Sequence, residues 1–505
     1  MNKEEIRFLE GDSVCQLLKD SEFMGKLNAL YQESKNKTIF QSPGFIKSWY
    51  LTKILEFSPI AVISLSANRL EGAVFFAVKR ERSGKVKKYK AKIVGVGEYD
   101  AEYQTWLVRE GKEKEFLPKV FDLISNTYPK CKMVFRFIPY PECLSWLDEN
   151  QYWKKSSVVQ ACRRPLMQMS HPDLNAVFKK KRFKAKYNRF NRAGKMELEE
   201  ITELNRFKEV FDEVMVLYDF RQGSLFNKTP TKSNPLRGPL FFSLFEQNML
   251  HVTVLKLDED ITSCIIGMKS EKWMHLSGLI TYSPFYSKLS PGMVHLFILG
   301  KYLKNQGYEY FDLTPGDDGY KERMATNTDD VYELTVCKDT VFKSKRQLRK
   351  KFHRLLLSNG IRPMTFNLEI QRSKHFIQKK LNQIKNKIFP TKNNSFSNTA
   401  GPIEFEKNNI KHLLAYNDPL GTSRWDFLSF AFNKVESGET FLSWTDDKRL
   451  LACIWFTVSS NQTEEEGQSA TFLQTDSYIH PKVLIRKEEI TKLARSILPT
   501  LGHDT

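Results

Sequence analysis

The order of elements between residues 274 and 336 constrains the fold of this chain more than any other feature. Four segments follow one another there with the pattern of a strand, a helix and two further strands, at 274–281, 293–305, 308–313 and 331–336. A loop rich in serine and proline precedes the helix, and Gly307 ends it. The first N–H groups of such a helix have no partner inside it, so this layout can bind an anion.

The helix begins at Ser290-Pro291-Gly292. Ser290 can cap the helix, Pro291 suits its first position, and Gly292 lets a ligand approach the backbone. We therefore predict that residues Ser290 to Met293 hold an anionic group. An ordinary capped helix that binds no ligand is the alternative interpretation.

This stretch resembles the CelD-type (cellulose-biosynthesis) acetyltransferase domain, a branch of the GNAT acyltransferase superfamily. The resemblance is carried by Tyr286, the Ser290-Pro291-Gly292 loop, the helix closed by Gly307, Phe311-Asp312-Leu313, Gly316 and Tyr320-Lys321. Upstream matches at the helix entry 40–49 and the turn at Asp100 extend it over most of residues 1–340. The resemblance implies that acyl-CoA, chiefly acetyl-CoA, is the co-substrate. We expect no metal, because the sequence has no His-rich or CxxC metal-ligand spacing.

The order of elements, read with this resemblance, predicts an α/β (α+β) fold of tandem GNAT-like domains with mixed, mostly antiparallel sheets. The N-terminal domain spans 1–155, and the catalytic domain spans 160–340. Residues 341–400 predict a basic helical segment and a polar linker, and 401–505 predict the front of a third GNAT-like unit. This incomplete unit is expected to serve docking or formation of a homodimer.

Acyl transfer to an amine requires a held acyl donor, a base and a stabilised oxyanion. Asp312 lies near a strand end, where functional groups gather in α/β sheets, and is the candidate base or orienting carboxylate. The family pattern adds Tyr320, as general acid or stacking wall, and Lys321, as a cation for substrate phosphate or carboxylate. Asp317 and Asp318 fit a turn. A turn former at 312 and an exposed loop pair at 320–321 are the alternatives.

Further residues are candidates for substrate binding. Asp219 and Arg221 are expected at the end of a helix over 207–220, where they can select the acceptor or simply be solvated. Lys186 and Arg189 lie three residues apart on a predicted basic helix over 174–193, a face that can hold phosphate. The resemblance adds Tyr286. His275 and His295 are isolated in the sequence and are expected to be satisfied core or surface histidines.

Basic residues are concentrated in two segments. The chain has 78 Lys and Arg against 59 acidic residues, a net charge of +19. Residues 341–392 hold 15 of these cations and one acid, Glu369, and residues 178–195 hold nine and no acid. Such segments suit an anionic surface, a phosphorylated substrate or tRNA, and solvated helix faces are the alternative.

Seven scattered cysteines without a CxxC pair indicate a reducing compartment and no zinc site or disulfide framework. The start of the chain lacks an apolar signal core, and no apolar run approaches the roughly 20 residues of a membrane span. We therefore expect a cytoplasmic protein.

The resemblance to the CelD-type domain implies an acyltransferase that moves an acyl group, chiefly acetyl from acyl-CoA, to an amine or hydroxyl of a sugar, polysaccharide or cell-envelope precursor. The saccharide acceptor rests on this resemblance alone. The 290–293 loop lacks the Gln/Arg-x-x-Gly-x-Gly form usual in GNAT enzymes. Two alternatives stay open. One is a Fem-like transferase that takes its acyl group from aminoacyl-tRNA, and the other is a non-catalytic scaffold with a duplicated fold.

Overall fold

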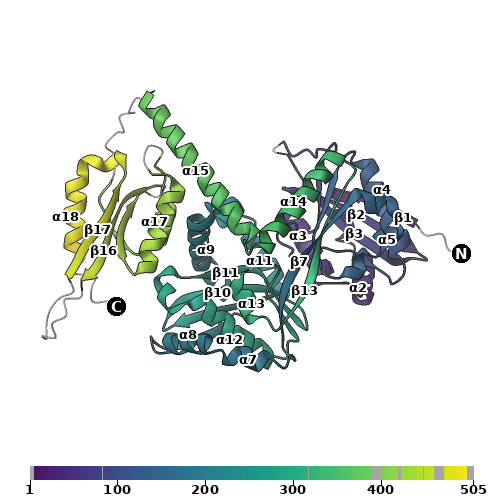
Figure 1. The fold of residues 1–505 in the computed structure, drawn as a ribbon, viewed down its shortest axis with the longest axis horizontal. Coiled ribbons are helices and arrows are strands. Elements are labelled where there is room, and N and C mark those ends of the chain that lie inside the picture. Colours follow the sequence, from purple (N-terminus) through teal and green to yellow (C-terminus); the bar gives the residue numbers. More distant parts are fainter. Residues whose placement is uncertain are drawn as a thin grey trace.

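The computed structural model describes residues 5–81, 83–316, 318–388, 401–418, 422–446, 448–459 and 471–497. In these ranges one large mixed sheet runs through two successive halves of the chain, and a smaller sheet forms the C-terminal unit (Figure 1). The predicted linker residues 393–399 and the predicted turn residue Asp317 lie outside the described residues.

In the N-terminal half of the sheet, strand β2 is buried on both faces. The strands of this half are β1 (Glu5–Glu10), β2 (Phe57–Ser66), β3 (Arg69–Lys79), β4 (Lys92–Gly95), β5 (Leu107–Val108) and β6 (Lys132–Ile138). Its helical segments are α1 (Asp12–Leu17), α2 (Ser21–Glu33), η1 (Ile39–Gln41), α3 (Pro43–Lys53), α4 (Glu113–Thr127), η2 (Pro141–Leu144), α5 (Trp146–Glu149) and α6 (Gln151–Ser156). Because side chains alternate along a strand, Ala61 and Ile63 join the core with α3, and Ile60 and Val62 join the core with α4.

The apolar spacing of residues 14–31 predicts one helix, but the structure has two in this region. The carboxylate of Asp20 accepts from the backbone N–H groups of Glu22 and Phe23, so it starts a new helix, α2, and α1 ends before it.

The second half repeats the order of hairpin strands followed by strand, helix and strand. Its strands are β8 (Met196–Glu200), β9 (Leu250–Leu257), β10 (Asp260–Lys269), β11 (Trp273–Tyr282) and β12 (Tyr310–Asp312). Its helical segments are α7 (Leu174–Lys179), α8 (Lys181–Asn191), α9 (Leu204–Phe226), α10 (Pro230–Ser233), α11 (Arg237–Glu246), η3 (Pro284–Leu289), α12 (Pro291–Asn305) and α13 (Gly319–Met324). Two predicted helices differ: the one over 174–193 is divided at Lys180, whose ψ of 121° is not helical, and the one over 207–220 continues to Phe226.

Two long strands join the halves, β7 (Ser157–Gln168) and β13 (Asn327–Cys337). β13 pairs with β6 of the first half on one side and with β7 on the other, and β7 pairs with β12 of the second half. The pairs β4–β6 and β11–β12 are parallel, and the remaining strand pairs of this sheet are antiparallel. The predicted tandem fold with a mixed, mostly antiparallel sheet is therefore confirmed, and the two halves share one sheet.

Two basic helices, α14 (Thr340–Ser358) and α15 (Pro363–Ile388), lead to the C-terminal unit. That unit contains β14 (Glu406–Lys407), α16 (Ile410–Leu414), α17 (Arg424–Ser437), β15 (Thr440–Thr445), β16 (Leu450–Ser459), β17 (Thr471–Ile479), η4 (Pro481–Arg486) and α18 (Lys487–Ile497). It docks through α17 on α9, where the Trp425 indole N–H donates to the Ser224 carbonyl at 3.0 Å. Among the helices of the described residues, none is both long and apolar enough to cross a membrane.

Candidate active site

Strands β11 and β12 separate after a short parallel pairing, and this separation creates the site. Their pairing ends at His275 opposite Asp312, whereas β11 continues to Tyr282. The chain beyond β12 turns away at Thr314, which has a positive φ of 63°. β11 also bulges against β10 beside Gly278, whose φ is 132°.

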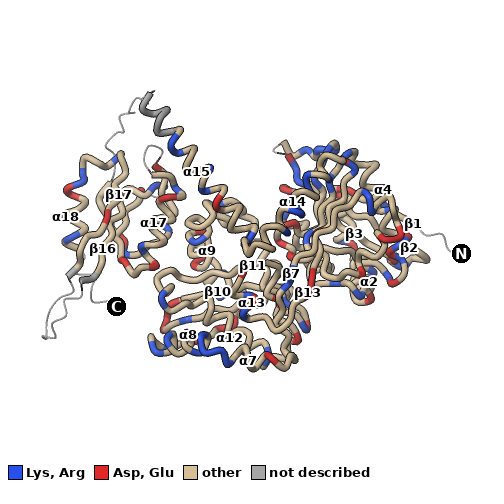
Figure 2. Tube along the Cα trace, in the orientation of Figure 1, with Lys and Arg blue, Asp and Glu red and all other residues tan. Residues whose placement is uncertain are grey.

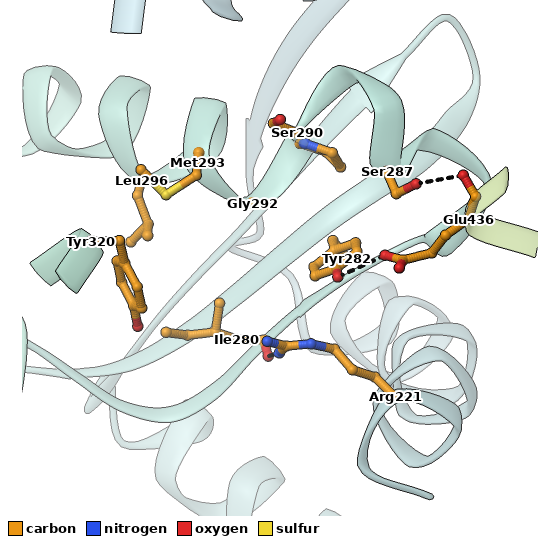
Figure 3. Close-up of a pocket in the computed structure, with 11 residues that line it drawn as sticks. Arg221, Ile280, Tyr282, Ser287, Ser290, Gly292, Met293, Leu296, Tyr320 and Glu436 are labelled. Carbon is orange, nitrogen blue, oxygen red and sulfur yellow. Dashed lines mark hydrogen bonds between the residues drawn. The ribbon is translucent and has the colours of Figure 1, made fainter. Parts of the chain in front are cut away.

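A cavity of about 340 Å³ lies beyond this separation, at the start of α12. It is lined by Arg221, Ile280, Tyr282, Ser287, Ser290, Pro291, Gly292, Met293, Leu296, Tyr320 and Glu436. Figure 3 shows Tyr320 and Leu296 on one side, Tyr282 and Glu436 on the other, and Gly292 between them. The predicted donor loop 290–293 thus lines a cavity together with Arg221 and Tyr320.

The first turn of α12 leaves room for a ligand. A Cβ atom at Gly292 would meet one neighbour, Tyr282 Cδ1 at 3.7 Å, which is an ordinary contact. The backbone of Pro291 has no N–H to satisfy, and the helix dipole adds partial positive charge at this end. These features fit a phosphate group.

Ser290 does not cap the helix with its side chain as predicted. It adopts a left-handed conformation with φ of 58°, and its hydroxyl instead accepts from the Lys186 ammonium at 2.6 Å. Burial, with the nearby Arg189 and Arg323 charges, lowers the pKa of Lys186. Arg189 itself is exposed on α8. The predicted basic helix therefore brings a cation to the start of α12.

Two guanidinium groups contact neighbouring carbonyls of β11. Arg221 donates to the Ile280 carbonyl at 3.3 Å, and Arg237 donates to the Gly278 carbonyl at 2.8 Å. Each guanidinium also lies 5.0 Å from an aromatic ring centre, that of Tyr282 or Tyr218. Within the described ranges neither arginine forms an ion pair with a carboxylate, and the Nε atom of each is buried without a hydrogen-bond partner. The sequence did not single out Arg237.

The remaining polar groups of the cavity come from two parts of the chain. Glu436 of the C-terminal unit accepts from the Tyr282 hydroxyl at 3.1 Å, and its carbonyl accepts from the Ser287 hydroxyl at 3.2 Å. Burial and Asp318 raise the pKa of Tyr320 to about 12. Tyr320 therefore carries its proton at neutral pH and can donate a hydrogen bond.

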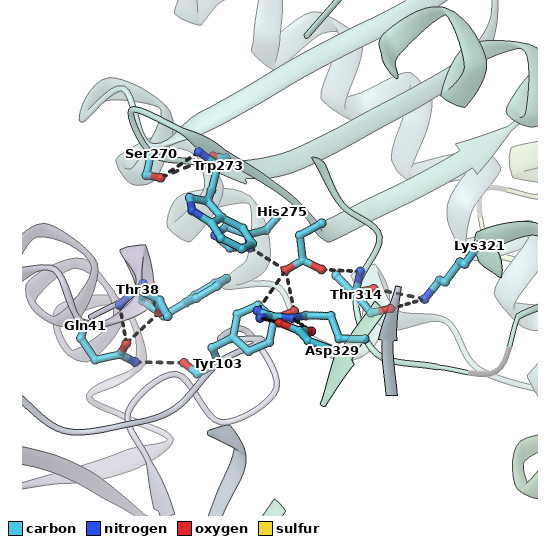
Figure 4. A network of polar contacts seen from close by, with 12 residues as sticks. Thr38, Gln41, Tyr103, Ser270, Trp273, His275, Thr314, Lys321 and Asp329 are labelled. Atoms are coloured by element: carbon cyan, nitrogen blue, oxygen red, sulfur yellow. Dashed lines mark hydrogen bonds and ion pairs between the residues drawn. The ribbon is translucent and has the colours of Figure 1, made fainter. Parts of the chain in front are cut away.

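Asp312 belongs to a polar network whose members Tyr103, His275 and Thr314 are labelled in Figure 4. Its carboxylate accepts from the Tyr103 hydroxyl at 2.5 Å and the Thr314 N–H at 2.8 Å, and it lies 2.8 Å from His275 Nδ1. Arg164 lies 4.0 Å away and binds Asp329 through its Nε at 2.7 Å.

The side chain of Asp312 is 0% exposed. Burial alone would raise its pKa, but His275, Arg164 and Tyr103 outweigh burial, so the pKa lies below its usual value. The carboxylate stays ionised, and its protein partners surround it. It is thus placed to orient Tyr103, His275 and Thr314.

The network includes three residues that the sequence did not point to as functional: Tyr103, Arg164 and His275. Tyr103 comes from the N-terminal half, 209 residues from Asp312, and no local pattern relates them. Its backbone carbonyl accepts from the Gln41 side chain at 3.0 Å, which ties the network to η1. His275 was expected to be a satisfied core or surface histidine, and it is buried beside Asp312. Its place in an apolar strand was the signal in the sequence that could have pointed to this network.

The other predicted site residues have structural partners. Lys321 is buried, and its ammonium donates to the Thr314 hydroxyl at 3.1 Å and lies 3.4 Å from the Asp318 carboxylate. Asp219 lies inside α9, and its carboxylate accepts from the Thr231 and Lys232 N–H groups at 2.9 and 3.3 Å, which fixes α10.

Two further residues named from the sequence also have partners within the protein. They are Tyr286, a predicted substrate-binding residue, and His295, which was expected to be a satisfied histidine. Tyr286 donates to Asp260, outside the cavity lining. His295 is fully buried and lies within 3.1 Å of both the Ser263 and the Thr253 hydroxyl groups, as expected for a satisfied core histidine. Among the described residues, no group of three or more His, Cys, Asp or Glu side chains is arranged to hold a metal ion.

Comparison with known proteins identifies the kind of domain that holds this cavity. Residues 178–322 match the family model described as acetyltransferase (GNAT) domain. No curated protein sequence matches the chain.

Three solved structures are similar over about two thirds of the chain. FemX is 11% identical, with 65% of this chain and 98% of that chain covered and a TM-score of 0.44. L-PGS from Bacillus licheniformis is 14% identical, with 65% and 96% covered and a TM-score of 0.41. A tandem GNAT protein from the clavulanic acid biosynthesis pathway is 9% identical, with 65% and 98% covered and a TM-score of 0.37.

The matched segment contains every residue that lines the cavity except Glu436. Residues 178–322 thus match an acetyltransferase (GNAT) domain, and this match supports acyltransferase activity.

Proposed function

We propose that this chain transfers an acyl group, chiefly acetyl from acyl-CoA, to an amine or hydroxyl group of a saccharide or cell-envelope precursor. The observation that carries the proposal is the cavity at the first turn of α12, inside the segment that matches a GNAT domain. The saccharide acceptor rests on the resemblance of residues 274–336 to the CelD-type domain.

The first turn of α12 supports a phosphate-bearing donor. Gly292 adds no side chain there, the helix dipole favours negative charge, and Lys186 lies beside Ser290. A donor whose phosphates contact residues 290–293 has its acyl end in the cavity between Tyr320 and Arg221.

The two arginines that contact β11, Arg221 of α9 and Arg237 of α11, support an anionic group on the acceptor. Arg221 and Arg237 have no carboxylate partner within the described ranges, so a ligand phosphate or carboxylate can satisfy both guanidinium groups. Glu436 is the carboxylate in the cavity lining and can hold the acceptor's ammonium or hydroxyl group.

The chemistry we propose is direct attack on the thioester. The acceptor amine forms a C–N bond to the acyl carbon, the C–S bond breaks, and the electron pair leaves on the thiolate. The amine loses its proton to water. The Tyr320 hydroxyl, whose pKa of about 12 keeps it protonated, gives a proton to the thiolate and then recovers one from water. Asp312 acts as a positioning residue because it is enclosed by protein groups.

Calorimetric titration with acetyl-CoA tests the donor site. Gly292→Trp fills the cavity from a helical position that accepts a side chain, so we expect it to abolish the binding seen with wild type. Gly25→Trp on α2 is the matched control, because a Cβ there meets nothing within 4 Å. Equal binding by all three proteins, or no binding by wild type, would contradict the acyl-CoA proposal.

Aminoacyl-tRNA is the second candidate donor. It is favoured by the exposed cations of α8, since Arg182 and Arg189 lie on the helix whose Lys186 contacts Ser290. If tRNA is the donor, the logarithm of its affinity falls with the logarithm of salt by roughly 0.7 to 0.9 per phosphate contact. A filter-binding series over salt concentration measures this slope, and a flat response excludes the tRNA donor.

A further inference from the structure

Helix α14 turns three of its seven cations toward the protein. The Lys343 ammonium donates to the Lys155 carbonyl at 2.7 Å, and the Lys350 ammonium donates to the Val159 carbonyl of β7 at 2.5 Å. Arg346, one turn from each, forms an ion pair with Glu333 of β13. Positions 343, 346 and 350 share one face of a helix, so this polar face is the one that rests on the large sheet.

The opposite face of α14 is apolar and exposed. Val341, Leu348, Phe352 and Leu355 are 64%, 69%, 41% and 59% exposed. Their spacing of seven, four and three residues places them in one stripe along the helix. A surface helix of a globular protein normally buries such a stripe, so α14 has the reverse of the usual orientation.

Helix α15 repeats this arrangement against the C-terminal unit. The Lys379 ammonium binds Asp426 at 2.9 Å, and the His375 ring lies 5.2 Å from the Trp425 ring centre. The exposed apolar residues on its other side are Ile370, Ile377 and Leu381, again with spacings of seven and four. Both helices thus contact the protein largely through polar groups, with Leu356 of α14 buried beside them, and present an apolar stripe to solvent.

Cations flank the exposed stripe. α14 has seven Lys and Arg residues and no acidic residue, and Lys345, Arg349, Lys351 and Arg354 among them are exposed. Figure 2 shows blue segments along both α14 and α15. Of the seven cations in α14, Arg346 is the one that forms an ion pair within the described part of the chain.

We propose that α14 and α15, the basic arm, bind the surface of an anionic lipid bilayer. An interfacial helix buries its apolar stripe at the boundary of headgroups and acyl chains while its flanking Lys and Arg residues contact anionic headgroups. A second copy of the same arm would bring like charges together along the whole stripe. RNA would bind the Lys and Arg side chains but leave the apolar residues exposed to water, so it does not account for the apolar stripe.

Co-sedimentation of the full chain with vesicles tests this proposal. Wild type is expected to bind phosphatidylcholine vesicles that contain phosphatidylglycerol and not pure phosphatidylcholine vesicles. The variant L348S/L355S keeps every charge and should lose roughly tenfold or more in affinity, because two apolar anchors are removed. The variant K345Q/R349Q should lose about fivefold for each charge removed.

The matched control is L55S/I485S, which removes two exposed apolar side chains outside the arm, at 82% and 78% exposure, and should bind vesicles like wild type. Acetyl-CoA affinity should be the same in all these variants, since none of the changed residues lines the cavity. The proposal is overturned if wild type does not bind vesicles, if its binding does not depend on phosphatidylglycerol, or if L348S/L355S binds as well as wild type. It is also overturned if wild type is a dimer that the substitutions L348S/L355S dissociate, or if wild type binds RNA but not vesicles.

Discussion

Asp312 illustrates at the residue scale how environment decides the role of a carboxylate. Its position at a strand end beside a Gly-containing loop made it the candidate base or orienting carboxylate, and that role stays a prediction. The sequence could not indicate that Tyr103, His275 and Thr314 would occupy its oxygen atoms, because Tyr103 comes from the other half of the chain. The same limit applies to Ser290, where a Lys186 contact from another helix replaced the expected cap.

Tyr103→Phe tests the positioning role of this network. The variant keeps the buried ring and removes one hydrogen bond to an ionised carboxylate, so the free energy of unfolding should fall by about 1–3 kcal/mol. Urea denaturation measures this change. Acetyl-CoA affinity should change little, because Tyr103 does not line the cavity. A stability equal to that of wild type would show that the bond contributes nothing.

His295 makes stability depend on pH. Burial, with a smaller contribution from His251, lowers its pKa to about 3, against about 6.5 in an unfolded chain. The unfolded chain therefore binds this proton first as the pH falls, so the stabilisation is complete above about pH 6.5 and is lost toward pH 3. His295→Gln should reduce the slope of unfolding free energy against pH by up to about 1.4 kcal/mol per unit in this window. Urea titrations at a series of pH values test this, and identical slopes would refute it.

At the scale of elements, α9 shows why a helix end was misplaced. The polar residues and glycine after Phe220 suggested a stop, but the helix continues to Phe226 because α17 covers that turn. A Cβ at Gly223 would lie 2.8 Å from Leu428 Cδ1, and the Ser224 carbonyl accepts from Trp425 and Ser429. A contact with a unit 200 residues away is invisible to local pattern. The helix predicted over 293–305, by contrast, agrees closely with α12 (Pro291–Asn305).

Gly223→Leu should loosen the C-terminal unit from α9. The larger side chain meets Leu428 directly, so we expect faster amide exchange in α17 and a lower melting temperature. Hydrogen exchange with mass spectrometry measures the effect. Gly25→Leu is the control, because that helical glycine has open space around it. Unchanged exchange in α17 would mean that the turn at Gly223 is not a docking contact.

At the scale of the whole molecule, β7 and β13 connect the two halves. β13 pairs with β6 of the first half, and β7 pairs with β12 of the second half, so we expect the two halves to fold as one unit. The sequence indicated two similar halves, but strand pairing between residues 157–166 and 327–336 cannot be read from either half alone. The N-terminal half without β13 has an unpaired edge at β6.

A fragment of residues 1–156 should therefore aggregate or unfold, while residues 1–337 should fold. Size-exclusion chromatography and thermal melting followed by circular dichroism compare the two. A monomeric 1–156 fragment with a cooperative transition would show that the shared sheet is not needed for folding.

The most direct test of the account is amide hydrogen exchange with and without acetyl-CoA. If the first turn of α12 holds the donor phosphates, acetyl-CoA should slow exchange at residues 290–294 and leave α2 and α14 unchanged. Protection confined to α14 and α15, or no protection anywhere, would contradict the assignment of the cavity at Gly292 as the donor site.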